Sequence, residues 1–223
     1  TLDELSLTDN NEVVISLAIL FEYLKETQKI GLERINTLNV YSENQFMRLD
    51  LATRRNLELT ETMRNKEKKG SLLWVLDKTK TAMGKRLIKT YIEQPLLNIS
   101  AILKRQAAVE EIYSDIVLMD ALKGQLNGVY DLERLMTRIV YGSANARELR
   151  SLCFTISKLP EIKDVLSCAK SKLLVEINNN IDSLIDIETL IDAAIVEEPP
   201  ISVKEGSIIK HGYDSEIDLL RGD

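Results

Sequence analysis

The stretch from Asp131 to Leu149, which reads DLERLMTRIVYGSANAREL, decides the fold class of this chain. Its first half repeats apolar residues at helical spacing behind Asp131, a good N-cap residue, and Gly142 then ends the pattern. Its second half pairs Asn145 with Glu148 at the spacing of a capping box, which predicts the start of a second helix. Two helices joined by a tight turn are therefore predicted.

Helical periodicity continues on both sides of this stretch. Nine glycines and four prolines in 223 residues are few, and strand-like alternation is rare. We predict helices at residues 12–28, from the N-cap Asp50 onward, from Thr81 to Gln94, from Ser100 to Ser114, from Asn145 to Pro160, and at 173–195 as one long helix or a helix pair. An extended piece at 38–49, a polar loop at 64–70 and a short β-like piece at 207–210 complete the pattern.

The sequence thus predicts an all-α fold, an irregular multi-helix bundle with a short β-like piece near the C-terminus. A last helix, capped by Asp214, stops with the sequence at Asp223 after barely two turns. An isolated helix of that length is not stable, so we expect it to continue and the sequence to be a fragment.

Charge is unevenly distributed along the chain. The formal net charge is -6, and residues 171–223 carry 12 acidic and 4 basic residues, which leaves a small positive balance for residues 1–170. A protein that coats nucleic acid over its whole surface needs a concentrated basic face, so that class is excluded. The sequence contains no stretch that resembles a signal peptide or a membrane span, which favours a reducing cytoplasm. With only two cysteines and one histidine, a disulfide framework or a zinc site is excluded.

Motifs for catalysis are missing from the printed sequence. Gly84 precedes Lys85, but no glycine stands five positions before it, so no phosphate-binding GxxxxGK[ST] loop is formed. The chain also has no GxSxG or HExxH motif. We therefore expect no enzymatic activity from this segment and assign no catalytic, cofactor-binding or metal-binding residue.

Three features could serve binding or coupling. Arg54 and Arg55 precede Glu58, which fits ordinary ion pairing or a joint between domains. A basic run, Lys66, Lys68 and Lys69, fits a solvated loop or a phosphate contact. Trp74, inside the apolar run from Leu72 to Leu76, fits the core or a buried interface.

Five blocks of sequence, in order along nearly the whole chain, resemble the core domain of the bacterial MutS family of mismatch-recognition proteins. They are YLKETQK at 23–29, MRLDLATRRNLEL at 47–59, SLLWVLDKTKTAMGKR at 71–86, the stretch after Asp131, and GSIIKHGYDSEIDLLR at 206–221. The ordered match of five blocks is far more specific than any one short motif.

The resemblance implies a part of a larger machine. Members of the family are dimers with a mismatch-reading domain, a connector, a helical core, a DNA clamp and a P-loop ATPase that uses ATP and Mg. The expected partners of the parent protein are mismatched duplex DNA, a second subunit and a MutL-type repair protein, without a membrane, in the bacterial cytoplasm near the nucleoid. Residues 1–205 would form the helical core, and residues 206–223 would begin the long lever helix toward the clamp.

The expected role of the segment is to transmit nucleotide-dependent movement from the ATPase to the clamp. The candidate structural joint consists of Asp50, Arg54, Arg55, Asn56, Thr81, Met83 and Gly84. Gly84 is expected to permit a close helix approach, and Arg54→Ala is expected to weaken the coupling of ATP to DNA release in the parent protein.

Two other functions remain open at this point. The same architecture would suit a MutS-like paralogue that acts on recombination intermediates, and an aromatic wedge in a mismatch-reading domain would distinguish the two. A helical protein-interaction adaptor without a nucleic-acid role would also suit the net charge and the missing catalytic motifs. Absence of a downstream P-loop in the natural reading frame would favour the adaptor.

Overall fold

A computed structural model describes residues 11–27 and 45–221 of the chain, which divides into two compact units, residues 1–43 and 44–223. The described part of the first unit is helix α1 (Asn11–Thr27), which confirms the helix predicted at 12–28 within one residue at each end. No residue of α1 is buried. Most of the extended piece predicted at 38–49 lies outside the described residues.

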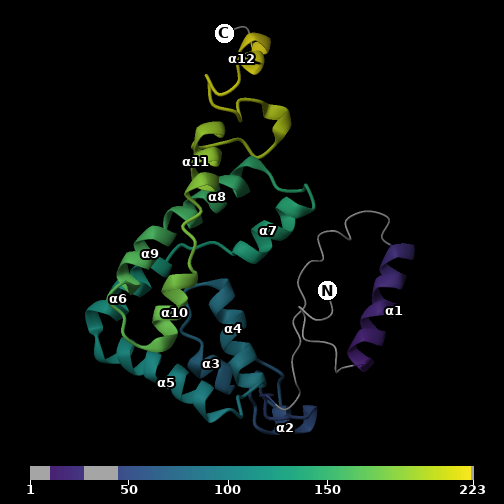
Figure 1. Cartoon of the computed structure of the whole chain (residues 1–223), viewed down its shortest axis with the longest axis vertical. Helices are drawn as coiled ribbons and strands as arrows, with labels where there is room; N and C mark the ends of the chain where they lie inside the picture. The colour runs from purple at the N-terminus through teal and green to yellow at the C-terminus, as the bar shows by residue number, and fades with distance from the viewer. Residues whose placement is uncertain (1–10, 28–44, 222–223) are drawn as a thin grey trace. The chain divides into compact units, whose positions relative to one another are not determined.

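The second unit is built from helices, and Figure 1 shows α2 near one end of this unit and α12 at the other. Their bounds are α2 (Leu51–Asn56), α3 (Leu72–Leu76), α4 (Ala82–Glu93), α5 (Ile99–Ser114), α6 (Ile116–Leu126), α7 (Leu132–Val140), α8 (Ala146–Ser157), α9 (Leu159–Leu166), α10 (Lys172–Asn180), α11 (Ile185–Ala194) and α12 (Ser215–Arg221). A single 3-10 turn, η3 (Val203–Glu205), precedes α12. The all-α prediction is confirmed.

Buried apolar residues form three separate clusters in this unit. The α8 cluster packs α7, α8 and α11 around Ile156, which is 1% exposed. The α5 cluster joins α5, α9 and α10 through Ala108, Leu166 and Leu174. The α3 cluster is the smallest, with Leu59, Leu73 and Ile92 buried against one another. The core is therefore divided along the unit, and α9 contributes to two clusters: Leu159 packs against the α8 cluster, whereas Ile162 and Leu166 belong to the α5 cluster.

Most predicted helix starts are confirmed by their cap geometry. The side chains of Asp50, Thr81 and Asp131 each accept a hydrogen bond from a backbone N–H in the first turn of the helix that follows. Asn145 and Glu148 form both hydrogen bonds of the predicted capping box. Because these signals are local, they fix helix starts without knowledge of the tertiary structure.

The helix predicted from Asn145 to Pro160 was wrong at its end. Helix α8 ends at Ser157, and Pro160 lies in the first turn of α9. Proline has no backbone N–H, and in the first turn of a helix this causes no loss, because N–H groups there have no acceptor within the helix. Helix α5 starts at Ile99 with Asn98 as its cap, one residue before the predicted start. Helix α6 was not predicted, because its apolar residues are spread over all sides of the helix and form no single apolar face.

The long segment at 173–195 is a helix pair, one of the two predicted possibilities. Helix α10 ends at Asn180, and α11 begins after Leu184, whose φ of 47° lies in the left-handed region. The side chain of Asp182 accepts the Leu184 N–H at 3.0 Å and supports this turn. The β-like piece at 207–210 is an isolated antiparallel bridge between Ile195 and Ile209, and Asp214 caps α12 as predicted.

A buried hydroxyl connects the segment before α7 to α8. Thr155 is 1% exposed, and its Oγ1 accepts the Tyr130 N–H at 3.1 Å while donating to the Ser151 carbonyl at 2.9 Å. Tyr130 also packs edge-on against Phe154, with ring centroids 6.0 Å apart. These contacts hold the start of α7 against the α8 cluster.

Candidate structural joint

The first half of the predicted joint lies on α2. Asp50 caps this helix by accepting the Thr53 N–H at 2.6 Å, and this hydrogen bond lowers the pKa of Asp50. Arg54 turns back toward the chain before the helix, where its Nε donates to the Leu49 carbonyl at 3.0 Å. Arg55 and Asn56 are exposed. Ion pairing of the two arginines with Glu58, one of the two interpretations of this run, is not seen among the described residues; the Glu58 carboxylate accepts the Met63 N–H at 2.7 Å.

The second half lies at the start of α4. Thr81 Oγ1 accepts the Gly84 N–H at 3.0 Å, and Met83 is partly buried beside this cap. A Cβ added at Gly84 would meet Thr81 Oγ1 at 3.0 Å and Thr79 Cβ at 3.5 Å. The close approach at Gly84 is therefore made by the loop that precedes its own helix, and the expected approach of a second helix is not seen among the described residues.

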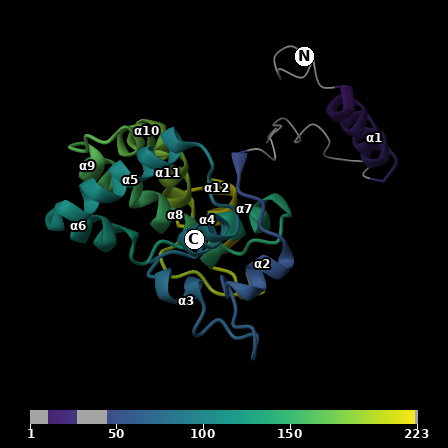
Figure 2. The same ribbon diagram turned by 90° about the horizontal axis from the view of Figure 1, so that it is seen from below.

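Both halves of the joint border the α3 cluster. The segment after α2 is held to α3 by two backbone hydrogen bonds, from Leu73 N–H to the Leu59 carbonyl at 2.8 Å and from Leu72 N–H to the Glu58 carbonyl at 3.0 Å. Ile92 of α4 completes the cluster, and both views show α2, α3 and α4 close together (Figure 2). The halves share this core, but no hydrogen bond or ion pair joins them directly in the part that the structure describes.

A charged contact connects α4 to α7. Arg86 is half-exposed, and its two terminal nitrogens donate to the two carboxylate oxygens of Asp131 at 2.8 and 2.7 Å. A third contact joins Arg86 to Glu133 at 2.6 Å. Bidentate arginine–carboxylate pairs fix orientation as well as distance. This contact ties α4, which carries Ile92 of the α3 cluster, to the start of α7, which carries Leu135 of the α8 cluster.

Asp131 serves two elements with one carboxylate. Besides accepting from Arg86, it accepts the Arg134 N–H at 3.3 Å as the N-cap of α7. The Arg86 guanidinium lowers the pKa of Asp131 to about 2, and the Asp131 hydrogen bonds raise the pKa of Arg86. A displacement of α4 would therefore act directly on the first turn of α7.

The basic run at 66–69 lies in the polar loop before α3. Lys66 and Lys69 are exposed, whereas Lys68 forms an ion pair with Asp77, which is nearly buried. The Lys68 ammonium lowers the pKa of Asp77 to about 2. Lys68 is thus a structural partner that closes the loop over α3, and only its two neighbours are available to an external anion.

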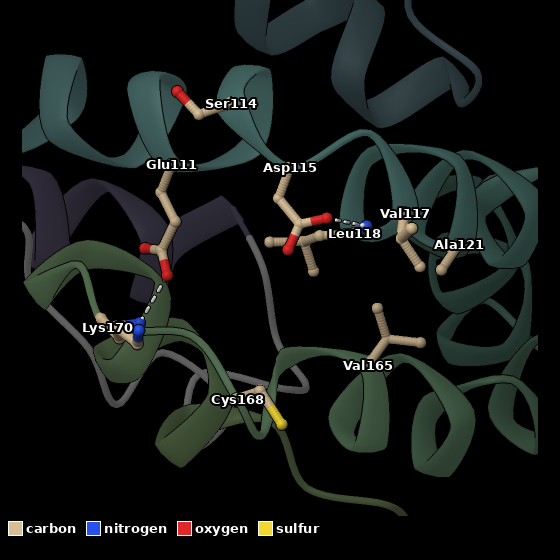
Figure 3. Close-up of a pocket in the computed structure, with 9 residues that line it drawn as sticks. All are labelled: Glu111, Ser114, Asp115, Val117, Leu118, Ala121, Val165, Cys168 and Lys170. Atoms are coloured by element: carbon tan, nitrogen blue, oxygen red, sulfur yellow. Dashed lines mark hydrogen bonds between the residues drawn. The ribbon is translucent and has the colours of Figure 1, made fainter.

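A pocket of about 620 Å³ lies elsewhere, between α5, α6 and α9 (Figure 3). Glu111 accepts the backbone N–H groups of Lys170 and Ser171, and Asp115 caps α6 by accepting the Leu118 N–H. Val165 faces Val117 and Ala121 across the pocket. Its carboxylates thus hold backbone N–H groups, and this arrangement is structural.

The described residues offer no assembled site for a metal. No group of three or more histidine, cysteine, aspartate or glutamate side chains within them could hold a metal ion. Cys153 is buried, Cys168 is exposed, and both are free thiols; His211 lies in an exposed turn. Within the same residues, no helix has the length and apolar character required to cross a bilayer.

Comparison with known proteins identifies the architecture. The family model for MutS domain III matches residues 52–222, which run from the second residue of α2 through α12 and include every residue of the candidate joint except Asp50. The chain belongs to the MutS domain III family. The match confirms the resemblance drawn from the five sequence blocks.

Curated relatives of this MutS domain share about half of its residues. The DNA mismatch repair protein MutS of Alkaliphilus oremlandii is 50% identical over 220 residues, which are 99% of this chain and 25% of that protein. Those of Acetivibrio thermocellus and Lachnoclostridium phytofermentans are 50% and 46% identical over 91% and 99% of this chain. The chain spans about a quarter of the length of the relatives it matches.

The contact between Arg86 and Asp131 is the feature of this MutS domain that sequence reasoning missed. Asp131 is predicted as a helix cap, and the sequence predicts no partner for Arg86. The two residues are 45 positions apart, and neither carries a local signal of the other. Only the tertiary structure, which brings the Arg86 guanidinium to the start of α7, reveals the pair.

Proposed function

We propose that this chain is the core scaffold of a DNA mismatch repair protein, in which it links an ATPase to a DNA clamp and transmits nucleotide-dependent movement. The observation that supports this role most directly is the match of residues 52–222 to MutS domain III. The parent protein would bind mismatched duplex DNA, use ATP and Mg, pair with a second subunit and engage a MutL-type partner in the bacterial cytoplasm. The segment itself would carry no catalytic residue.

The geometry supports transmission because the unit is built from small cores joined by defined polar contacts. A movement that reaches α4 is passed to α7 by the Arg86 contact, and α7 belongs to the same cluster as α8 and α11. Beyond α11, the bridge between Ile195 and Ile209 leads to α12, the start of the proposed lever. Packed elements with two discrete arrangements can carry such coupling over long distances.

Relatives named DNA mismatch repair protein MutS favour this role over that of a paralogue acting on recombination intermediates. The test is an in-frame deletion of the natural gene, followed by measurement of the frequency of spontaneous resistance mutations. The proposal predicts a raised frequency that the intact gene restores. The paralogue would be supported instead by an unchanged mutation frequency together with altered survival after DNA damage that is repaired through recombination.

A further inference from the structure

Helix α3 exposes most of its apolar residues. Of its five apolar residues only Leu73 is buried, while Leu72, Trp74, Val75 and Leu76 are 43%, 48%, 54% and 48% exposed. Other helices also expose single apolar residues, but four of five in one short helix make α3 a candidate interaction surface. The expectation that Trp74 is fully buried within this unit is therefore wrong, and the alternative, an interface, remains.

Unpaired cations lie on both sides of α3 in the sequence. Between Arg48 and Glu93 the sequence holds 12 basic and 6 acidic residues, against a net charge of -6 for the whole chain. Four of the six carboxylates cap a helix, accept a backbone N–H or pair with a lysine, which leaves Glu61 and Glu67. Seven exposed cations have no ion pair or side-chain hydrogen bond within the described residues: Arg55, Arg64, Lys66, Lys69, Lys78, Lys80 and Lys85.

We define the α3 face as Leu72, Trp74, Val75 and Leu76 together with the lysines that flank them in sequence, Lys66, Lys69, Lys78 and Lys80. From its chemistry we infer that the α3 face docks an acidic amphipathic helix of a partner protein. The apolar side chains would receive the apolar stripe of that helix, and the lysines would pair with the carboxylates along its edges. The inference rests on this face alone and does not depend on the proposed function.

Charge complementarity favours a protein helix over nucleic acid. A duplex backbone would satisfy the lysines, but contacts to phosphate use cations and polar groups and leave no role for three aliphatic side chains and a tryptophan. An acidic amphipathic helix satisfies both parts of the face. Trp74 lies in the middle of α3 and has the large, rigid surface typical of residues that dominate binding energy.

Trp74 is the only tryptophan of the chain, so its fluorescence reports on this face alone. The experiment titrates the 223-residue protein with a labelled 18-residue peptide that carries leucine at helical spacing and glutamate elsewhere. Trp74 emission and peptide anisotropy are both recorded. We expect a saturable blue shift of Trp74, with binding that weakens as salt increases because the charged rim is screened.

Two variants assign the binding to the α3 face. Lys78→Glu combined with Lys80→Glu should weaken peptide binding about tenfold or more, because the charges then repel the peptide. Trp74→Ala should weaken it by at least about thirtyfold in the anisotropy measurement. The matched control, Lys170→Glu with Lys204→Glu, makes the same change of charge at exposed lysines elsewhere and should bind as the parent chain does. Circular dichroism verifies that each variant keeps its helix content.

Four results would overturn the inference. A peptide of the same composition in scrambled order that binds equally well would show that only net charge matters. A 20-base-pair duplex that shifts Trp74 emission while the amphipathic peptide does not would assign the face to nucleic acid. Self-association in sedimentation velocity that is lost in the Lys78/Lys80 variant would assign it to a second copy. No response of Trp74 to the peptide would contradict docking outright.

Discussion

Asp131 joins two elements through one carboxylate, and its protonation should therefore be visible in stability. Its pKa is lowered from an ordinary value of 3.8 to about 2 by the Arg86 guanidinium, the largest cause, with the Arg134 N–H contributing. A carboxyl group whose pKa is lower in the folded state stabilises the fold above its unfolded pKa. That contribution is lost as the pH falls from about 4 toward 2.

Replacing Asp131 by asparagine should remove this pH dependence while keeping the helix cap, because asparagine is an equally good N-cap residue. At pH 7 we expect Asp131→Asn to melt at a lower temperature than the parent chain, and the difference should shrink below pH 4 as the parent carboxyl is protonated. Thermal unfolding by circular dichroism between pH 2 and 7 measures it. A constant difference across that range would show that the pair with Arg86 does not stabilise the fold.

Ser71 is the most deeply buried polar residue described, at 0% exposed, and it fixes the start of α3. Its hydroxyl donates to the Lys68 carbonyl at 2.7 Å and accepts the Trp74 N–H at 3.2 Å. Ser71→Ala should lower the free energy of unfolding by about 1–2 kcal/mol, because a cap and a buried hydrogen bond are lost. Urea unfolding followed by Trp74 fluorescence measures the change.

The control for Ser71 is Ser100→Ala, at an exposed serine in the first turn of α5. This change should stay within about 0.5 kcal/mol of the parent chain. Equal effects of the two substitutions would contradict the account of Ser71 as the residue that closes the loop at 64–70 onto α3.

Among the elements, α8 carries the largest share of the core, since five of its residues are buried. Ile156→Ala should lower the free energy of unfolding by about 2–5 kcal/mol, because it opens a cavity where α7, α8 and α11 meet. Leu103→Ala, at an exposed leucine on α5, should change it by less than about 1 kcal/mol. Denaturant unfolding of both variants tests this, and similar values for the two would contradict a core centred on α8.

Element starts could be predicted from sequence, whereas the contacts between elements could not. The caps at Asp50, Thr81, Asp131 and Asn145 need only a side chain and the next three backbone N–H groups. The break between α8 and α9 was missed because proline is compatible with the first turn of a helix as well as with the end of one. Helix α6 gave no signal because its apolar residues surround it.

Of the candidate joint, only the local caps are confirmed. Asp50 and Thr81 cap α2 and α4 as predicted, and the role of the seven residues as a joint stays a prediction. Arg54 makes a local contact, whereas Arg86 makes the contact that crosses to α7. A pair separated by 45 residues is defined by the packing of helices, which no spacing rule describes.

At the scale of the whole molecule, the account rests on transmission through a divided core. The proposed transmission requires parts of the unit to move as bodies, and the Arg86 contact connects elements of two of the three apolar clusters. The family match places the buried residues of these clusters in MutS domain III, and the chain spans about a quarter of the length of its relatives. The central claim is that coupling through this domain depends on the contact from α4 to α7.

The most direct test is ATP-triggered release of mismatched DNA from the full-length parent protein carrying Arg86→Ala. The account predicts slower or incomplete release with nearly unchanged ATP affinity, because the nucleotide site is intact and the connection to α7 is lost. Lys89→Ala, on the same helix but paired only within it to Glu93, should release DNA as the parent protein does. Normal release from the Arg86→Ala protein, with its fold intact by circular dichroism, would contradict the central claim.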